Sequence, residues 1–302
     1  MQTYDWHIAG HETQRAQLEA DMNSDNISHA YLFYGPKEVG KARLARTFAN
    51  ILQCNHGLCG TCSVCVQIDK GCHFDTTVLY DNGEGVSIED VLTIIGAVSK
   101  TSQSNYKVVL IEDIERMSPP AANALLKTLE EPGASTIFLL TTNAIGGVLD
   151  TIKSRCRLVK FGSVSYDALE KFLQEKAGNS VREQNKIIVD SVTKEQAKIF
   201  SFGSVGKFFR LIKHPDDLRE QMQLYEKLVS LLEGASLPAK FKFAKEVGEE
   251  REKVATMLEM LAHIVRSLLL QSTGVSELGS ALTLGSTEKY TTEYLMGLLA
   301  RA

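Results

Sequence analysis

Long apolar runs are absent from this sequence of 302 residues. No window approaches the ~18 to 20 uninterrupted apolar residues that a membrane-spanning helix requires. The first residues also lack the basic segment followed by an apolar segment that marks a secretory signal. We therefore expect a cytoplasmic protein with no membrane partner.

A basic excess is lacking too, because 33 Lys and Arg are outnumbered by 37 Asp and Glu, for a net charge of -4. Proteins that grip DNA alone usually carry a strong basic excess, since neutralised phosphates supply most of the non-specific affinity. If this protein acts on DNA, we expect it to do so within a larger assembly. Its length predicts two or three domains rather than one small core.

The first half of the sequence alternates short strand-like and helix-like segments. Strands are predicted at residues 31–34, 77–80, 107–111 and 136–141, with helices between them. Continuous apolar strands separated by helices predict an α/β domain with a parallel sheet covered on both faces. Beyond about Phe161 only helical spacing appears, and the last helix is predicted at 291–299 after a polar loop at 274–285.

The segment Gly35-Pro-Lys-Glu-Val-Gly-Lys-Ala42 nearly matches the phosphate-binding loop G-x-x-x-x-G-K-[ST]. Gly35, Gly40 and the following helix start would form an anion site, with Lys41 at the β- and γ-phosphates. Ala42, however, has no hydroxyl for Mg²⁺, and Glu38 adds a carboxylate to the loop. Weak binding of ATP or ADP and a loop that keeps its shape without nucleotide are equal alternatives, and hydrolysis is not expected.

The strand at 107–111 is followed by two adjacent carboxylates, Glu112 and Asp113. In working ATPases the order is Asp, for the metal, and then Glu, for the attacking water. Here Glu112 is one methylene too long for the first role and Asp113 one too short for the second, and such chemistry is sensitive to shifts of about 1 Å. The pair therefore argues against catalysis. Metal binding and an acidic surface turn are both open readings.

Four cysteines crowd together as Cys54-x4-Cys59-x2-Cys62-x2-Cys65. In a cytoplasmic chain such a cluster indicates a metal site rather than disulfides. Zn²⁺ prefers four such ligands in a tetrahedron, and the lack of an open position predicts a structural zinc. Packed, reduced thiols are the alternative, with His56 and His73 as other candidate ligands.

Several segments coincide with the motifs of one family. They are His29-Ala-Tyr-Leu-Phe-Tyr-Gly-Pro36, the cysteine quartet, residues 121–132 and Ser154-Arg-Cys156. In order and spacing, residues 1 to about 162 resemble the bacterial DNA polymerase III clamp-loader AAA+ family. The resemblance implies a P-loop AAA+ domain at 1–162 with an inserted zinc module at about 53–75. It further implies a small helical lid domain at 163–214 and a helical collar domain at 215–302, which is short for the family.

Within that family the tau/gamma branch carries an intact phosphate loop, whereas Glu38, Ala42 and the Glu112–Asp113 order resemble the delta-prime branch. The resemblance implies a hetero-oligomer with tau/gamma and delta subunits that loads the β sliding clamp onto primed DNA during replication. It also assigns roles to three further residues. Arg155 would be an arginine finger for a neighbouring ATP site, Asn143 would lie at the sensor-1 position, and Lys207 would stand where an ATP-sensing arginine is common.

Three alternative functions each require a different feature of the protein. A tau/gamma-type motor that hydrolyses ATP would need Ser or Thr at residue 42. A stand-alone zinc enzyme needs three protein ligands and an open position, which four clustered cysteines do not leave. A homo-oligomeric AAA+ remodeller would be separated by the size of the isolated protein, which we expect to be a monomer. From spacing alone, Arg155 is an ordinary solvated surface residue.

Overall fold

The computed structural model describes residues 4–80, 85–99, 101–133, 135–178, 190–233, 236–248 and 251–272. Its contacts divide the chain into two compact units. The first comprises Met1–Val181 and Gly203–Gly206, and the second comprises Arg182–Phe202 and Lys207–Ala302. The division into three domains stays a prediction, and the loop at 274–285 and helix at 291–299 lie outside the described residues. Over the described ranges, no helix has the length and apolarity that crossing a membrane requires.

The first unit is built on a five-stranded parallel sheet with the order β2-β3-β4-β1-β5. The strands are β1 Ala30–Tyr34, β2 Thr76–Leu79, β3 Lys107–Ile111, β4 Thr136–Thr142 and β5 Arg157–Lys160. In β1, Leu32 lies opposite Leu140 of β4 on one side and Leu158 of β5 on the other. Every residue of β3 and β4 is buried, which explains the apolar runs at 108–111 and 137–140. Because all strands are parallel, the loops after β1, β3 and β4 meet at one edge of the sheet.

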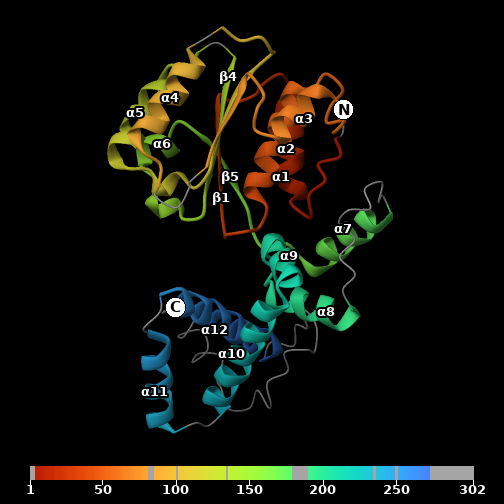
Figure 1. The fold of residues 1–302 in the computed structure, drawn as a ribbon, viewed down its shortest axis with the longest axis vertical. Helices are drawn as coiled ribbons and strands as arrows, with labels where there is room; N and C mark the ends of the chain where they lie inside the picture. The colour runs from red at the N-terminus through yellow and green to blue at the C-terminus, as the bar shows by residue number, and fades with distance from the viewer. Residues whose placement is uncertain are drawn as a thin grey trace. The chain divides into compact units, whose positions relative to one another are not determined.

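Helices cover both faces of this sheet, as predicted (Figure 1). One face carries α1 Glu12–Asn23, α2 Lys41–Gln53 and α3 Ser63–Asp69, and the other carries α4 Ile88–Val98, α5 Pro119–Glu130 and α6 Asp150–Lys153. Adjacent residues of β1 enter the two cores, with Phe33 in the first and Leu32 in the second. Two 3-10 turns, η1 Ile114–Arg116 and η2 Ile145–Gly147, follow β3 and β4.

Local signals set the helix starts on the second face. Ser87 and Asp90 form a capping box at the start of α4, with both reciprocal hydrogen bonds present. Helix α5 begins at Pro119, because the Ser118 hydroxyl accepts a bond from the Ala121 N–H and proline suits the first helical position.

Helices make up the described part of the second unit, which agrees with the helical spacing of the sequence. They are α8 Ser191–Phe200, α9 Val205–Lys213, α10 Pro215–Glu233, α11 Leu237–Gly248 and α12 Arg251–Ser272, while α7 Tyr166–Gly178 lies in the first unit. Phe208 and Leu211 of α9 are fully buried, as is Met260 of α12.

Candidate functional site

The predicted phosphate loop lies between β1 and α2, where the parallel strands end. Gly35 has φ +148°, and a Cβ atom there would lie 2.3 Å from the carbonyl oxygen of Phe161. Gly40, with φ +111°, is the N-cap residue that precedes α2. Residues with a side chain rarely adopt such φ values, so both glycines are required by the path of the loop.

Lys41 is buried and turns its ammonium group back onto the loop. It donates to the carbonyl oxygens of Gly35 (2.9 Å) and Pro36 (2.5 Å) and to the side-chain oxygen of Asn143 (2.8 Å). Burial lowers the pKa of Lys41, an effect that the charges of nearby Asp113 and Glu115 oppose. An ammonium group has three donors, and all three are used within the protein.

The carbonyl groups of the loop are held one after another. After the two bound by Lys41, the carbonyl of Lys37 accepts from the Ser204 hydroxyl (3.3 Å) and that of Glu38 from the Gly206 N–H (2.8 Å). His11 donates from Nε2 to the carbonyl of Val39 (2.9 Å), and burial lowers the pKa of this histidine. Protein contacts therefore fix the shape of the loop at five consecutive carbonyls.

The two acidic residues after β3, Glu112 and Asp113, bind different partners. Glu112 accepts a 2.6 Å bond from the Arg46 guanidinium, which lies over the ring of Tyr80. Asp113 instead accepts a 2.6 Å bond from the Asn143 amide, so that Asn143 links Lys41 to Asp113. Among the predicted nucleotide-site residues, the structure thus brings Lys41, Asp113 and Asn143 together and ties Glu112 to α2.

Two residues of this site were missed from the sequence. Arg46 lies on the helix after the loop, but no spacing rule connects it with residue 112. Glu115 accepts a 2.9 Å bond from the backbone N–H of Asn143 and contributes negative charge near Lys41. Its position just past the acidic pair was the available signal, although a turn residue with a carboxylate is common.

Lys207, predicted at a nucleotide-sensing position, belongs to the second unit. Its ammonium donates a 2.9 Å bond to Glu259 of α12 and lies 4.5 Å from the ring centroid of Phe202. His263 stacks on the same ring, with centroids 3.9 Å apart. Within its own unit Lys207 is therefore fixed by an ion pair and an aromatic ring.

Arg155 lies in the turn between α6 and β5. One end of its guanidinium pairs with Glu130 of α5, and the other donates to the carbonyl oxygen of Thr151 (2.8 Å) and to the Ser154 hydroxyl (3.4 Å). Cys156 beside it is half-buried, and burial raises the pKa of its thiol to about 12. The turn thus buries the cysteine partly and keeps the arginine at the surface.

The four predicted metal ligands converge. Their sulfur atoms all lie within 4.8 Å of one another, and Cys54 lies 3.8 Å from both Cys59 and Cys62. Metal–sulfur bonds of about 2.3 Å in a tetrahedron place neighbouring sulfurs about 3.8 Å apart. The donor set and its spacing therefore fit a metal ion.

The surroundings of the sulfurs differ. Backbone N–H groups, that of Thr61 first and then that of Cys62, lower the pKa of the Cys59 thiol to about 6. Burial raises the pKa of the Cys65 thiol to about 12. A bound cation favours the thiolate form of every ligand, so metal binding would release protons from this cluster.

The alternative ligands His56 and His73 are not among the residues whose ligand atoms converge. His73 is buried with Nδ1 3.0 Å from the Thr76 hydroxyl, and Cys72, outside the quartet, is exposed. Across the described residues, the quartet is the group of three or more Cys, His, Asp or Glu side chains whose ligand atoms converge.

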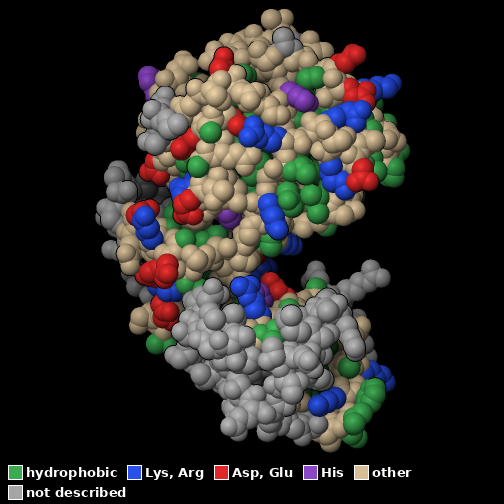
Figure 2. All heavy atoms as spheres, turned by 180° about the vertical axis from the view of Figure 1, so that it is seen from behind, with side chains coloured by type: hydrophobic (Ala, Val, Ile, Leu, Met, Phe, Trp, Pro, Cys, Tyr) green, Lys and Arg blue, Asp and Glu red, His purple; other side chains and the backbone are tan. Residues whose placement is uncertain are grey.

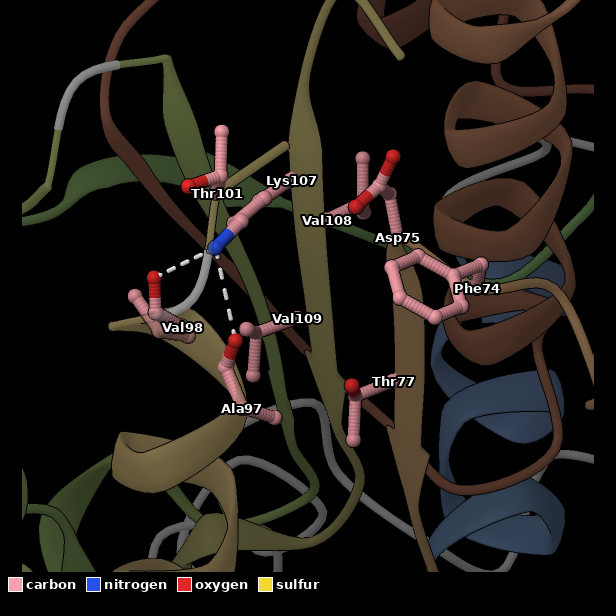
Figure 3. A pocket seen from close by; sticks show the side chains of 9 residues that line it. All are labelled: Phe74, Asp75, Thr77, Ala97, Val98, Thr101, Lys107, Val108 and Val109. Atoms are coloured by element: carbon pink, nitrogen blue, oxygen red, sulfur yellow. Dashed lines mark hydrogen bonds between the residues drawn. The ribbon is translucent and has the colours of Figure 1, made fainter. Parts of the chain in front are cut away.

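A separate hollow lies at the opposite end of the strands (Figure 3). Lys107, the first residue of β3, reaches across it to the carbonyl oxygens of Val98 (2.7 Å) and Ala97 (3.4 Å). This lysine stabilises the C-terminal end of α4, where a positive charge is favourable. On the face drawn in Figure 2, Lys and Arg side chains of the described residues are interspersed with Asp and Glu, in keeping with the low net charge.

The comparisons with known proteins agree on one family. A family model described as "DNA polymerase III, delta subunit" matches residues 10–165, more than half of the chain. DNA polymerase III subunit delta' of Pseudomonas aeruginosa is 42% identical over 136 residues, which cover 43% of this chain and 42% of that protein. Subunit delta' of Bacillus subtilis is 35% identical over 162 residues, covering 52% of this chain and 49% of that protein.

Relatives with other names are similar as well. DNA polymerase III subunit gamma of Buchnera aphidicola is 34% identical over 197 residues, covering 62% of this chain and 52% of that protein. The chain spans about half the length of the curated relatives it matches. A solved structure of a gamma subunit-related protein from Thermotoga maritima covers 94% of this chain and 98% of its own, with 18% identity and a TM-score of 0.43. A likeness of that degree supports no argument.

The matched region contains the parallel sheet, the phosphate loop, the cysteine quartet and Arg155. These are the features on which the sequence resembles clamp-loader AAA+ proteins, and they lie in one folded unit. The chain therefore belongs to the family described as DNA polymerase III, delta subunit, which confirms the predicted P-loop α/β fold and the clamp-loader resemblance.

Proposed function

We propose that this chain is a delta-prime-type subunit of a DNA polymerase III clamp loader in the cytoplasm. In this role it assembles with tau/gamma- and delta-type subunits and helps place the β sliding clamp on primed DNA. The names of the relatives support the role. The observation that carries it is Ala42, because this residue removes the Mg²⁺ ligand from a phosphate loop that is otherwise complete in shape.

The loop does not catalyse hydrolysis in this proposal. The Glu112 carboxylate is paired with Arg46. The metal ligand at residue 42 and a correctly placed base are both missing. With five of its carbonyls held by the protein, the loop would keep its shape without nucleotide.

Arg155 acts on a neighbouring subunit in this proposal. A guanidinium that approaches a γ-phosphate stabilises the charge that develops during transfer, and a finger supplied in trans is worth ~10³ to 10⁵ in rate in well-studied GTPases. The position of Arg155 in a surface turn supports the role. Its planar fork offers the bidentate geometry that a phosphate accepts.

The cysteine quartet holds a structural zinc ion in this proposal. All four ligand positions come from the protein, which leaves no place for a substrate or a reactive water. When bound, the ion would cross-link the end of α2 with the turn at Cys59 and the start of α3. Cys62 already serves as the residue that caps α3, where its sulfur accepts from the Cys65 N–H.

The main test uses a reconstituted clamp loader that carries Arg155→Ala. We expect assembly to be complete, and clamp loading and DNA-stimulated ATP hydrolysis to fall in part, because the other ATP sites keep their own fingers. Arg219→Ala is the control, since Arg219 is an exposed arginine that also pairs with one carboxylate. Wild-type rates with Arg155→Ala would return this residue to an ordinary surface role. Arg155→Lys separates charge from shape, because lysine keeps only the charge.

A tau/gamma-type motor is the second candidate function. The similarity to gamma subunits over a longer stretch of the chain favours it. ATP turnover by the isolated chain decides between the two. Turnover of ordinary ATPase magnitude that Lys41→Ala abolishes would support the motor and overturn the delta-prime proposal, whereas we expect background rates.

A further inference from the structure

Arg155 is held at two points by groups from different elements. Nη2 pairs with the Glu130 carboxylate near the end of α5, and Nη1 donates to the carbonyl oxygen of Thr151 in α6. A planar group bound at both of its terminal nitrogens is fixed in direction as well as in place. The Ser154 hydroxyl, 3.4 Å from Nη1, adds a third contact on the side of Thr151.

This ion pair adds little to the stability of the fold. The side chains of Arg155 and Glu130 are 32% and 49% exposed. Exposed pairs of this kind contribute little, because solvent screens them and two long side chains must be ordered. A role other than stability is therefore the better account of a contact that joins residues 25 positions apart.

The pair also leaves part of the guanidinium available. An arginine has five N–H donors, and three acceptors are found for Arg155 among the described residues. The remaining donors can meet an anion without breaking the bond to Glu130. A side chain that is already ordered loses less conformational entropy when it binds.

We propose that Glu130 is a positioning residue that orients the Arg155 guanidinium for the ATP site of a neighbouring subunit. This inference rests on the arginine-finger role proposed above. Glu130 does not touch the nucleotide and acts only through Arg155. Its effect is therefore on the rate of the chemical step, where the finger stabilises the developing charge, rather than on the affinity for ATP.

The test measures kcat and KM for ATP in a reconstituted clamp loader, with assembly checked by size. We expect Glu130→Ala to lower kcat by no more than the partial loss that Arg155→Ala causes, because Arg155 regains freedom that it must lose on binding. KM should stay close to the wild-type value. Glu130→Gln should keep most of the rate, because its amide oxygen can still accept from Nη2. Glu130→Asp should lower kcat although it retains the charge, because its side chain is too short to reach Nη2.

Two controls separate the explanations. Glu131→Ala removes the neighbouring exposed carboxylate, for which no contact with Arg155 is found, and it should behave as wild type. Adding Glu130→Ala to Arg155→Ala should cause no further loss, because the two residues act through one group.

The outcomes distinguish this inference from the proposal beneath it. If Arg155→Ala leaves kcat unchanged, the arginine-finger role of Arg155 is wrong, and the positioning role of Glu130 fails with it. If Arg155→Ala lowers kcat and Glu130→Ala does not, the finger holds and the positioning role is wrong. A higher kcat in Glu130→Ala would also overturn it, since the carboxylate would then compete for Arg155. If the Glu130→Ala variant fails to assemble, the kcat values of Glu130→Gln and Glu130→Asp still test the positioning role. Equal values for these two variants would overturn it.

Discussion

The Lys41 ammonium lies 2.8 Å from the side-chain oxygen of Asn143. The amide nitrogen of the same asparagine donates to Asp113, so one amide joins a buried cation to a carboxylate. The three donors of the Lys41 ammonium are satisfied by Gly35, Pro36 and Asn143. The arrangement gives the loop internal partners that do not depend on a ligand.

Asn143→Ala should therefore destabilise the first unit by about 1–3 kcal/mol, because Lys41 and Asp113 each lose a partly buried hydrogen-bond partner. Trp6 is the single tryptophan and is fully buried in the core of that unit, so its fluorescence reports denaturant unfolding there. Asn26→Ala, at an exposed position, is the control and should change stability by less than about 0.5 kcal/mol. Equal unfolding free energies for both variants would show that the amide link contributes nothing.

Gly35→Ala should lower the free energy of unfolding of the first unit by roughly 2 kcal/mol or more. The new Cβ would lie 2.3 Å from the Phe161 carbonyl oxygen, and both groups belong to rigid backbone. Gly40→Ala is a matched comparison, since no atom lies within 4 Å of its Cβ position and only the φ of +111° opposes it. The same unfolding experiment checks both variants. A Gly35 variant as stable as wild type would mean that the loop can move away from β5.

Removal of one metal ligand should abolish metal binding. We expect Cys62→Ser to lose the ion that wild-type protein retains, and Cys72→Ser, at an exposed cysteine outside the quartet, to keep it. Elemental analysis after dialysis gives the metal content. Hydrogen exchange should rise around residues 54–72 and stay unchanged in α9 and α10, because metal binding is coupled to local folding. Full metal content in Cys62→Ser would exclude this ligand set.

The second unit should lose stability as the pH falls from 6.5 towards 4. Burial lowers the pKa of His263 to about 4, and the charges of Lys207 and Arg266 act in the same direction while Glu259 opposes them. The unfolded chain, with a histidine pKa near 6.5, binds the proton first as the pH falls. The unfolding free energy is therefore highest above pH 6.5 and declines below it, by about 2 kcal/mol or less, because the ring is partly solvated.

His263→Gln removes the titrating group and should flatten this dependence. Hydrogen exchange of α12 at pH 7 and pH 5, corrected for intrinsic rates, compares the two proteins. The measurement isolates His263 from other groups because both proteins share all the rest. If the protection of α12 changes with pH in His263→Gln as it does in the wild type, a group other than His263 causes the pH dependence.

Much of the first unit could be predicted from the sequence because its signals are local. Strand β3 was predicted at its observed bounds, and β1, β2 and β4 differ by one residue. Strands β1, β3 and β4 are almost entirely buried, so apolar residues dominate their sequences, whereas β2 is mostly half-buried. Helix α1 was missed because its sequence is mostly polar, with Leu18 and Asp21 as its buried residues. The four-residue strand β5 was missed because exposed residues interrupt its pattern.

The site was predictable where motif and chemistry coincide, as in the loop glycines, Lys41 and the cysteine quartet. The partners of these residues were not predictable. Arg46 pairs with Glu112 and Glu130 with Arg155 through contacts 66 and 25 residues apart, which depend on how the elements pack. Glu112 and Asp113 have different partners, and the backbone between them is left-handed at Asp113, with φ 50°. The residue pattern of the sequence does not predict this conformation.

The bonds from Ser204 and Gly206 to the phosphate loop also bear on how the protein can be dissected. A fragment that ends where the family match ends, at residue 165, keeps the loop sequence and the sheet. It loses the donors that hold the carbonyls of Lys37 and Glu38, which lie about 170 positions earlier in the chain. Such a fragment should therefore have a looser loop than the full chain, and nucleotide binding measured on it would not represent the intact protein.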